Sequence, residues 1–232
     1  MGKDVIIALD FNSMTEALDF LSPFEEALFL KVGMELYYKE GPEIVRQLKK
    51  RGHKIFLDLK LHDIPNTVKK ATISMLDLKV DMINYHIPGG RKMLEEATQV
   101  VKKRNPKMIT LGITMLTSTD EEMMKNEILL RCQTVEDAVL SYAKLGQKAG
   151  LSGVVCSALE VPRIKKELGE NFLTVTPGIR REITSHDDQK RVVTPRQAGE
   201  LGSDYIVVGR PITQSENPYG SYHDIKNEFL GV

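Results

Sequence analysis

The chain has 232 residues, of which 41% are hydrophobic and 28% are charged, as in an ordinary soluble globular protein. Its 32 basic and 32 acidic side chains balance, so the composition shows no electrostatic footprint for nucleic acid or for a membrane surface. The apolar run near the N-terminus is too short for a signal peptide, so we expect a cytoplasmic protein. Cys132 and Cys156 lie far apart and outside any metal-binding spacing, which predicts two inert thiols.

Short apolar runs of strand length alternate with helical segments along the whole chain. The predicted strands are VIIALD (5–10), ALFLKVG (27–33), the run from Lys54 to Leu59, DMINYHI (81–87), MITLGIT (108–114), GVVCS (153–157), FLTVTPGIR (172–180) and DYIVVGR (204–210). The first predicted helix begins at Ser13, which forms a capping box with Glu16, and ends at about Phe20. The third strand is followed by a helix that Pro65 opens and that continues through Val68–Leu78, and two later helices begin at Pro195 and at about Tyr219. The other predicted helices are Pro42–Lys50, Arg91–Lys103, Val135–Lys148 and Ala158–Leu168. Segments 115–128 and 181–194 are predicted loops.

Eight strand–helix pairs in one chain, with no linker between them, predict a single (β/α)8 TIM barrel domain over residues 1–232. A doubly wound open sheet is the alternative. The missing G-x-G-x-x-G after the first strand counts against a dinucleotide-binding version of that sheet.

The stretch KIFLDLKLHDIPNT (54–67) carries charge at a strand end. Because side chains alternate along a strand, Asp58 and Lys60 share the face of Phe56, and Asp63 follows where the helix begins. By the same alternation, Asp10 shares a face with Ile6 and Ala8 on the first strand, and Lys31 shares a face with Phe29 on the second. The triplet alone is as typical of a solvated loop or a structural ion pair as of a functional site.

A barrel gathers the carboxyl ends of all its strands at one face, where active sites form. That rule predicts one site from residues that are distant in the sequence: Asp10, Lys31, Asp58, Lys60, Thr117, Arg180 and Arg210. TPGIR and VVGRPIT each place a glycine beside an arginine after strands seven and eight, which favours phosphate binding. The segment 181–194 is either a lid over the site or an ordinary solvated connection.

These motifs together resemble the orotidine 5′-monophosphate decarboxylase family over nearly the whole chain. The matching parts are the Asp10 strand end, LKVGMELYY around Lys31, LDLKLHDIPNTV, LTS around Thr117, TPGIR with Gln189 downstream, and VVGRPIT. The resemblance implies decarboxylation of the nucleotide to UMP and CO₂, without cofactor or metal, in a homodimer whose subunits share their active sites.

The resemblance also implies roles for individual residues. Lys60 would protonate C6, Asp58 would lie beside the substrate carboxylate, and Lys31 and the partner subunit's Asp63 would complete an array of alternating charges. The remaining residues would bind substrate: Asp10 and Thr67 the ribose, Thr117 the pyrimidine, and Arg180, Gln189, Gly209 and Arg210 the phosphate.

Two departures from the family pattern are Met115, where glutamine is frequent, and the bulkier YHIPGG turn at residues 85–90. We expect modest effects from both, a core position for Tyr85, and structural roles for His62 and His86. Two alternatives to the decarboxylase remain open: a Mg²⁺-dependent sugar-phosphate lyase of a related barrel, and a barrel that binds a phosphate ligand without turnover.

Overall fold

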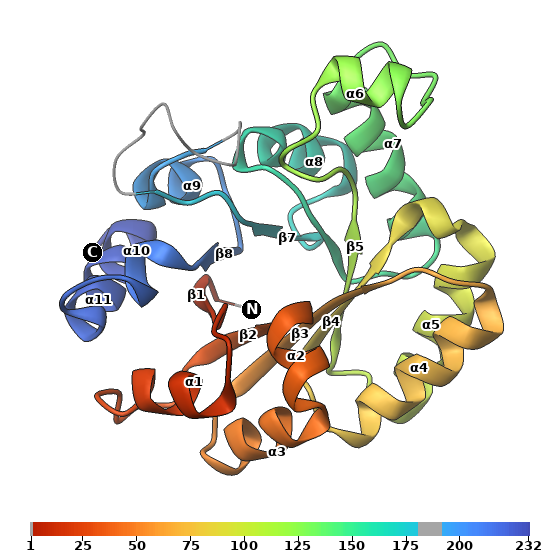
Figure 1. Ribbon diagram of the computed structural model, residues 1–232. Helices are drawn as coiled ribbons and strands as arrows, with labels where there is room; N and C mark the ends of the chain where they lie inside the picture. The colour runs from red at the N-terminus through yellow and green to blue at the C-terminus, as the bar shows by residue number, and fades with distance from the viewer. Residues whose placement is uncertain (1, 181–191) are drawn as a thin grey trace.

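The computed structural model describes residues 2–180 and 192–232, which fold around a closed barrel of parallel strands (Figure 1). The strands are β1 (Asp4–Ala8), β2 (Phe29–Gly33), β3 (Lys54–Leu61), β4 (Met82–His86), β5 (Ile109–Ile113), β6 (Gly153–Val155), β7 (Leu173–Thr176) and β8 (Tyr205–Val208). Each strand pairs with the next one in the sequence, and β8 pairs with β1. The (β/α)8 barrel is therefore confirmed, and the open sheet is wrong.

Helices surround the barrel on its outer side (Figure 1). They are α1 (Met14–Phe20), α2 (Met34–Glu40), α3 (Pro42–Lys50), α4 (Pro65–Asp77), α5 (Arg91–Arg104), α6 (Glu121–Asn126), α7 (Val135–Lys148), α8 (Val161–Leu168), α9 (Pro195–Glu200), α10 (Arg210–Thr213) and α11 (Pro218–Leu230), with 3-10 turns at Ile87–Gly89 and Ala158–Glu160. Among the helices of the described ranges, none has the length and apolar character needed to cross a bilayer.

The structure corrects several sequence-based boundaries. Helices α2, α6 and α10 fall where no helix was predicted. Strand β7 stops at Thr176 rather than Arg180, because Pro177 has no N–H for the ladder and Gly178 takes a φ of 81°. Arg210 begins α10 instead of ending a strand.

The capping box at the start of α1 forms only in part. The Ser13 hydroxyl accepts the Glu16 N–H at 3.2 Å, as predicted. The Glu16 carboxylate instead accepts the N–H of Asn12, at 3.3 Å, so the reciprocal bond is displaced by one residue.

The barrel strands bury both of their faces, and the alternation of side chains decides which residues enter the barrel. Ile6, Phe29 and Phe56 belong to the apolar cluster inside the barrel, whereas their neighbours along the strands pack outward against the helices. The inner face of β1, β2 and β3 is thus apolar along most of its length and charged at the carboxyl end. The charged side chains therefore lie directly above the apolar residues inside the barrel.

Two ion pairs fix the amino ends of strands that carry the site. Lys49 meets Asp81 at 2.7 Å before β4, and Lys165 meets Asp204 at 2.7 Å before β8. In both places the same aspartate oxygen also accepts a backbone N–H from the preceding strand. The pairs therefore hold β3 against β4 and β7 against β8 at the end opposite the site.

Candidate active site

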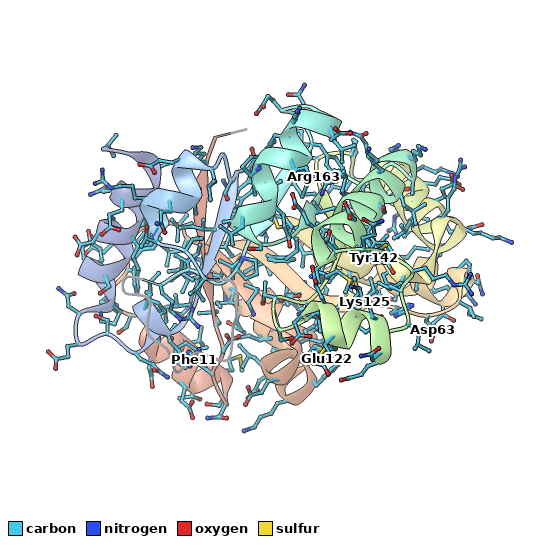
Figure 2. All side chains as sticks on the ribbon, turned by 90° about the horizontal axis from the view of Figure 1, so that it is seen from above. Phe11, Asp63, Glu122, Lys125, Tyr142 and Arg163 are labelled. Atoms are coloured by element: carbon cyan, nitrogen blue, oxygen red, sulfur yellow. The ribbon has the colours of Figure 1, made fainter. Side chains whose placement is uncertain are left out.

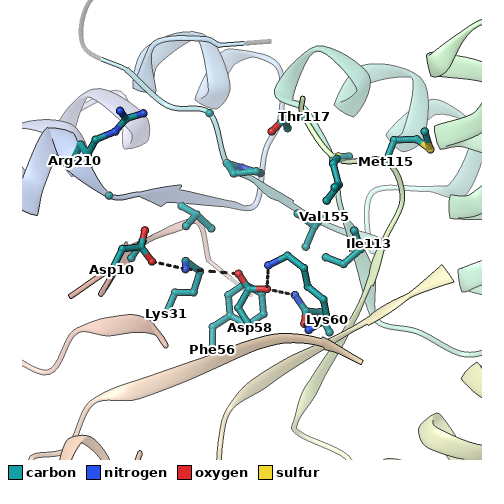
Figure 3. A pocket seen from close by; sticks show the side chains of 18 of the residues that line it. Asp10, Lys31, Phe56, Asp58, Lys60, Ile113, Met115, Thr117, Val155 and Arg210 are labelled. Carbon is teal, nitrogen blue, oxygen red and sulfur yellow. Dashed lines mark hydrogen bonds and ion pairs between the residues drawn. The ribbon is translucent and has the colours of Figure 1, made fainter. Parts of the chain in front are cut away.

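A cavity of about 310 Å³ opens at the carboxyl ends of the strands (Figure 3). It brings together eight residues that the sequence analysis assigned to one site: Asp10, Lys31, Asp58, Lys60, Thr117, Arg180, Gly209 and Arg210. These residues come from six different strand ends and their following loops, so only the closed barrel makes them neighbours.

Four of these side chains form a row of alternating charge along one wall. The Lys31 ammonium lies 3.0 Å from an Asp10 oxygen and 3.7 Å from Asp58 Oδ2. The Lys60 ammonium lies 2.8 Å from Asp58 Oδ1. Figure 3 shows the row running along this wall from Asp10 to Lys60. Asp58 and Lys31 are largely buried, with side chains 12% exposed, so little water screens their charges.

Asp58 is the electrostatic centre of this row. Burial acts to raise the pKa of its carboxyl group, but the Lys31 and Lys60 ammonium groups, with hydrogen bonds from Lys60 and Asn84, outweigh burial and lower that pKa below its ordinary value. Asp58 is consequently ionised at neutral pH.

Lys60 has an unusual backbone for a strand residue. Its φ is 51°, in the left-handed region that residues other than glycine rarely adopt. It falls within a register shift, since Leu57 pairs with Ile83 but Leu61 pairs with Tyr85, so that four steps along β3 match two along β4. The strand is thus distorted at the residue that presents the ammonium group.

Asn84, on β4, was missed by the sequence analysis. Its Oδ1 accepts the backbone N–H of Lys60 at 2.8 Å, and its Nδ2 donates to Asp58 Oδ1 at 2.6 Å. The signal was present in the sequence, because Asn84 shares the strand parity of Met82, which lies inside the barrel. A polar residue at that position of a buried strand points into the cavity.

The opposite wall of the cavity is mainly apolar. It includes Ile113, Met115, Val155 and Cys156, and Phe56 lies beneath the charged row (Figure 3). These surfaces exclude water from the ammonium and carboxylate groups, which strengthens their interactions. Met115 lines the cavity, although its side chain points away from the charged row and packs in the outer apolar cluster (Figure 3). Cys156 lies in the cavity wall, just after strand β6 rather than within it.

Gly33 leaves the space that the lysine of the charged row occupies. A Cβ atom at this position would lie 3.1 Å from Lys31 Nζ and 3.6 Å from Asp10 Oδ1. That contact is tighter than side chains normally tolerate. The absence of a side chain at Gly33 therefore permits the Asp10–Lys31 pair to form where it does.

The loops after β7 and β8 form the far end of the cavity. Gly178 takes a φ of 81°, which a residue with a side chain would adopt only with strain, and it turns the chain toward Arg180. Gly209 directly precedes α10, and Arg210 is the first residue of that helix. Arg210 lies across the cavity from Lys60 (Figure 3). A ligand that spans the cavity would meet an arginine at one end and the charged row at the other.

Two predicted residues do not line this cavity, and a third falls outside the residues that the structure describes. Asp63 and Thr67 are both exposed, and Asp63 accepts the N–H of Ile64 at 2.6 Å. Figure 2 shows Asp63 near the right-hand margin of the molecule. Gln189 lies outside the described residues, as does most of the segment 181–194, so the choice between lid and solvated connection stays open.

Two residues of the bulkier turn, Tyr85 and Ile87, are fully buried. Tyr85 is fully buried and its hydroxyl lies 3.1 Å from Thr72 Oγ1, which confirms its core position. The rings of His62 and His86 are 5.6 Å apart, and neither lines the cavity. Burial, followed by the nearby His62 and Lys60, lowers the pKa of His86. The structural roles assigned to the two histidines stay predictions.

Residues that could ligate a metal do not gather elsewhere in the described ranges. Across residues 2–180 and 192–232, the structure contains no group of three or more His, Cys, Asp and Glu side chains arranged to hold an ion. The carboxylates of the cavity are instead neutralised by lysines.

Comparison with known proteins agrees with this arrangement. A model of the orotidine 5′-phosphate decarboxylase / HUMPS family matches residues 3–225. The orotidine 5′-phosphate decarboxylase of Staphylococcus saprophyticus is 55% identical over 227 residues, covering 97% of this chain and 98% of the relative. That of Staphylococcus haemolyticus is 54% identical, covering 99% of this chain and 100% of the relative.

Solved structures give the same result. The orotidine 5′-phosphate decarboxylase from Lactobacillus acidophilus superimposes with a TM-score of 0.86 at 38% identity, covering 98% of this chain and 99% of that one. A conserved protein from Geobacillus kaustophilus also gives 0.86, at 44% identity, covering 97% of this chain and 99% of that one. The chain described here belongs to the orotidine 5′-phosphate decarboxylase / HUMPS family.

Proposed function

We propose that this protein decarboxylates orotidine 5′-monophosphate to UMP and CO₂ in pyrimidine biosynthesis, without a cofactor. The observation that carries the proposal is the Lys60 ammonium held 2.8 Å from an ionised Asp58 in a cavity whose opposite wall is mainly apolar. The near-full-length relatives bearing the decarboxylase name support it. We assign the activity to one domain, residues 1–232, in the cytoplasm.

The proposed chemistry explains why a lysine occupies this position. When the C6–carboxylate bond breaks, its electron pair stays on C6 and CO₂ leaves, and no neighbouring group of the pyrimidine accepts that pair. A positive charge fixed close to C6 stabilises this carbanion and does little for the neutral ring carbon before the bond breaks. Lys60 then gives C6 a proton and regains one from solvent. Asp58 lies next to the place that the substrate carboxylate would occupy.

The remaining residues bind and orient the nucleotide. In this proposal Arg180, Gly209 and Arg210 bind the phosphate together with Gln189, and Thr117 contacts the pyrimidine. Asp10 binds the ribose, and its place at the exposed end of the charged row suits that role. Binding energy from the phosphate and ribose then holds C6 against the Lys60 ammonium.

We further propose a homodimer in which Asp63 and Thr67 of each subunit complete the site of the other. Both residues belong to the motif that follows Lys60, yet neither lines the cavity of its own chain. The neighbouring Ile64 leaves 68% of its surface exposed, and burial by a partner would remove this apolar surface from water.

Chelation should leave the activity unchanged, because the Lys60 ammonium supplies the positive charge that a metal supplies in the alternative lyase. The test is the initial rate of decarboxylation before and after exhaustive dialysis against EDTA. An activity lost on chelation and restored by Mg²⁺ would favour the metal-dependent lyase. Absence of any turnover with orotidine 5′-monophosphate would favour a binding protein without activity.

Replacing Arg210 should affect only ligands that carry a phosphate. Arg210→Ala should weaken UMP binding roughly 10- to 100-fold, since a charge-assisted hydrogen bond to an anion is worth about 1.5–3 kcal/mol. Calorimetric titration with UMP and with uridine separates the two effects. Arg104→Ala, which removes an arginine paired with Asp77 on the outer helices, is the matched control. Equal weakening of UMP and uridine would refute the phosphate assignment.

A further inference from the structure

The side-chain amide of Asn84 connects two features of β3 that the reaction requires. Its oxygen accepts the backbone N–H of Lys60, and its nitrogen donates to the same Asp58 oxygen that the Lys60 ammonium meets. Asn84 is only 2% exposed, so no water competes for either bond. One side chain thus fixes both the backbone and the charge partner of Lys60.

The bond from the Lys60 N–H to the Asn84 oxygen takes the place of a regular hydrogen bond between β3 and β4. The register shift between β3 and β4 removes Lys60 from regular pairing. The Lys60 φ of 51° is a conformation that persists only where the surroundings hold it. The Asn84 oxygen gives the displaced N–H a buried acceptor, and it therefore favours the left-handed conformation from which the Lys60 side chain reaches Asp58.

The chemistry of the two partners fixes the orientation of the amide. A backbone N–H can only donate, and an ionised carboxylate can only accept. The Asn84 oxygen must then face Lys60, and its NH₂ group must face Asp58, as the distances of 2.8 Å and 2.6 Å indicate. An aspartate in this position would keep the acceptor but oppose Asp58 with a second negative charge. A leucine would keep the volume and lose both bonds.

We propose that Asn84 is a positioning residue for the decarboxylation, acting through Lys60 and Asp58 rather than on the substrate. This inference rests on the proposed function. It predicts that the residue governs the turnover rate more than nucleotide affinity, because a displacement of about 1 Å at a reacting group can lower a rate about 100-fold.

Asn84→Leu should therefore lower kcat about 100-fold while the dissociation constant of UMP changes only a few-fold. Tyr85→Phe is the matched control. It removes one buried hydrogen bond, to Thr72, from the adjacent residue of β4, which packs outside the barrel. The control should lower the melting temperature and leave kcat within a few-fold of wild type. A folded Asn84→Leu protein with wild-type kcat would overturn the proposal.

Asn84→Asp tests the orientation of the amide, and it decides the matter even where the leucine variant fails to fold. At low pH a protonated carboxyl group can donate to Asp58 and still accept the Lys60 N–H. At higher pH two carboxylates would face each other beside Lys60, with the Lys31 ammonium and the His86 ring also nearby. Relative to wild type, kcat should be highest at the acidic end and fall as the pH rises. A ratio to wild type that is independent of pH would contradict the assignment.

Crystal structures separate this inference from the proposed function. If wild type fails to decarboxylate orotidine 5′-monophosphate, the proposed function is wrong, and the role of Asn84 is judged from the geometry alone. The inference predicts that Asn84→Leu shows Lys60 at negative φ, with its ammonium displaced from Asp58. An unchanged Lys60 backbone and an unchanged contact with Asp58 would show that Asn84 does not position them.

Discussion

Mixing Lys60→Ala and Asp63→Ala chains should restore about a quarter of wild-type activity, although each homodimer alone should be nearly inactive. In a mixed dimer one site carries both lesions. The other site takes Lys60 from the Asp63→Ala chain and Asp63 from the Lys60→Ala chain, and is therefore wild type. Random exchange makes about half of the dimers mixed, each with one intact site of two.

The measurement is the specific activity of an equimolar mixture after subunit exchange, with mixed dimers quantified by native mass spectrometry. A mixture of Lys60→Ala and Asp58→Ala chains is the matched control, because these residues lie on one strand of one subunit, 2.8 Å apart. Its mixed dimers contain no intact site and should stay inactive. Demonstrated exchange without recovery in the first mixture would show that Asp63 does not complete the partner's site.

The sequence predicted the charged row from two rules. The alternation of side chains decides which residues of a strand enter the barrel, and barrel closure brings the carboxyl ends of distant strands together. Phe29 and Phe56 point into the barrel, and the same parity carries Lys31 and Asp58 into the cavity above them. Parity also assigned Lys60 to that side. The way the residue reaches its position could not be predicted, because the register shift depends on how β4 pairs with β3.

Other parts of the structure were harder to predict from the sequence. Helix α2 follows Gly33, which provides no capping side chain. Helix α10 has a proline in its first turn, but it is only four residues long and so shows no helical periodicity. Asn84 had the correct parity, but one asparagine in an apolar strand does not reveal its two partners. In the proposed homodimer, the positions of Asp63 and Thr67 in a complete site would depend on a second subunit, which a single chain does not specify.

Lys60→Ala should lower kcat by at least about 10⁴-fold. Loss of a general acid costs about 10²–10⁴-fold, and loss of a charge that stabilises the transition state costs about 10²–10³-fold. The fold should survive, because Lys31 still lies 3.7 Å from Asp58 and Asn84 still donates to it. Removal of the lysine side chain also leaves Arg180 and Arg210, the proposed phosphate-binding residues, in place. UMP should therefore still bind.

Simultaneous measurement of CO₂ release and UMP formation from orotidine 5′-monophosphate, for wild type and Lys60→Ala, tests the central claim most directly. Melting temperature and UMP binding are recorded on the same samples, and Lys144→Ala, which breaks an exposed pair with Glu167, serves as the control lysine variant. The account predicts equal amounts of CO₂ and UMP from wild type and from the control, and almost none from a folded Lys60→Ala protein that binds UMP. Substantial turnover by Lys60→Ala, or a loss of activity that merely follows a loss of folded protein, would contradict it.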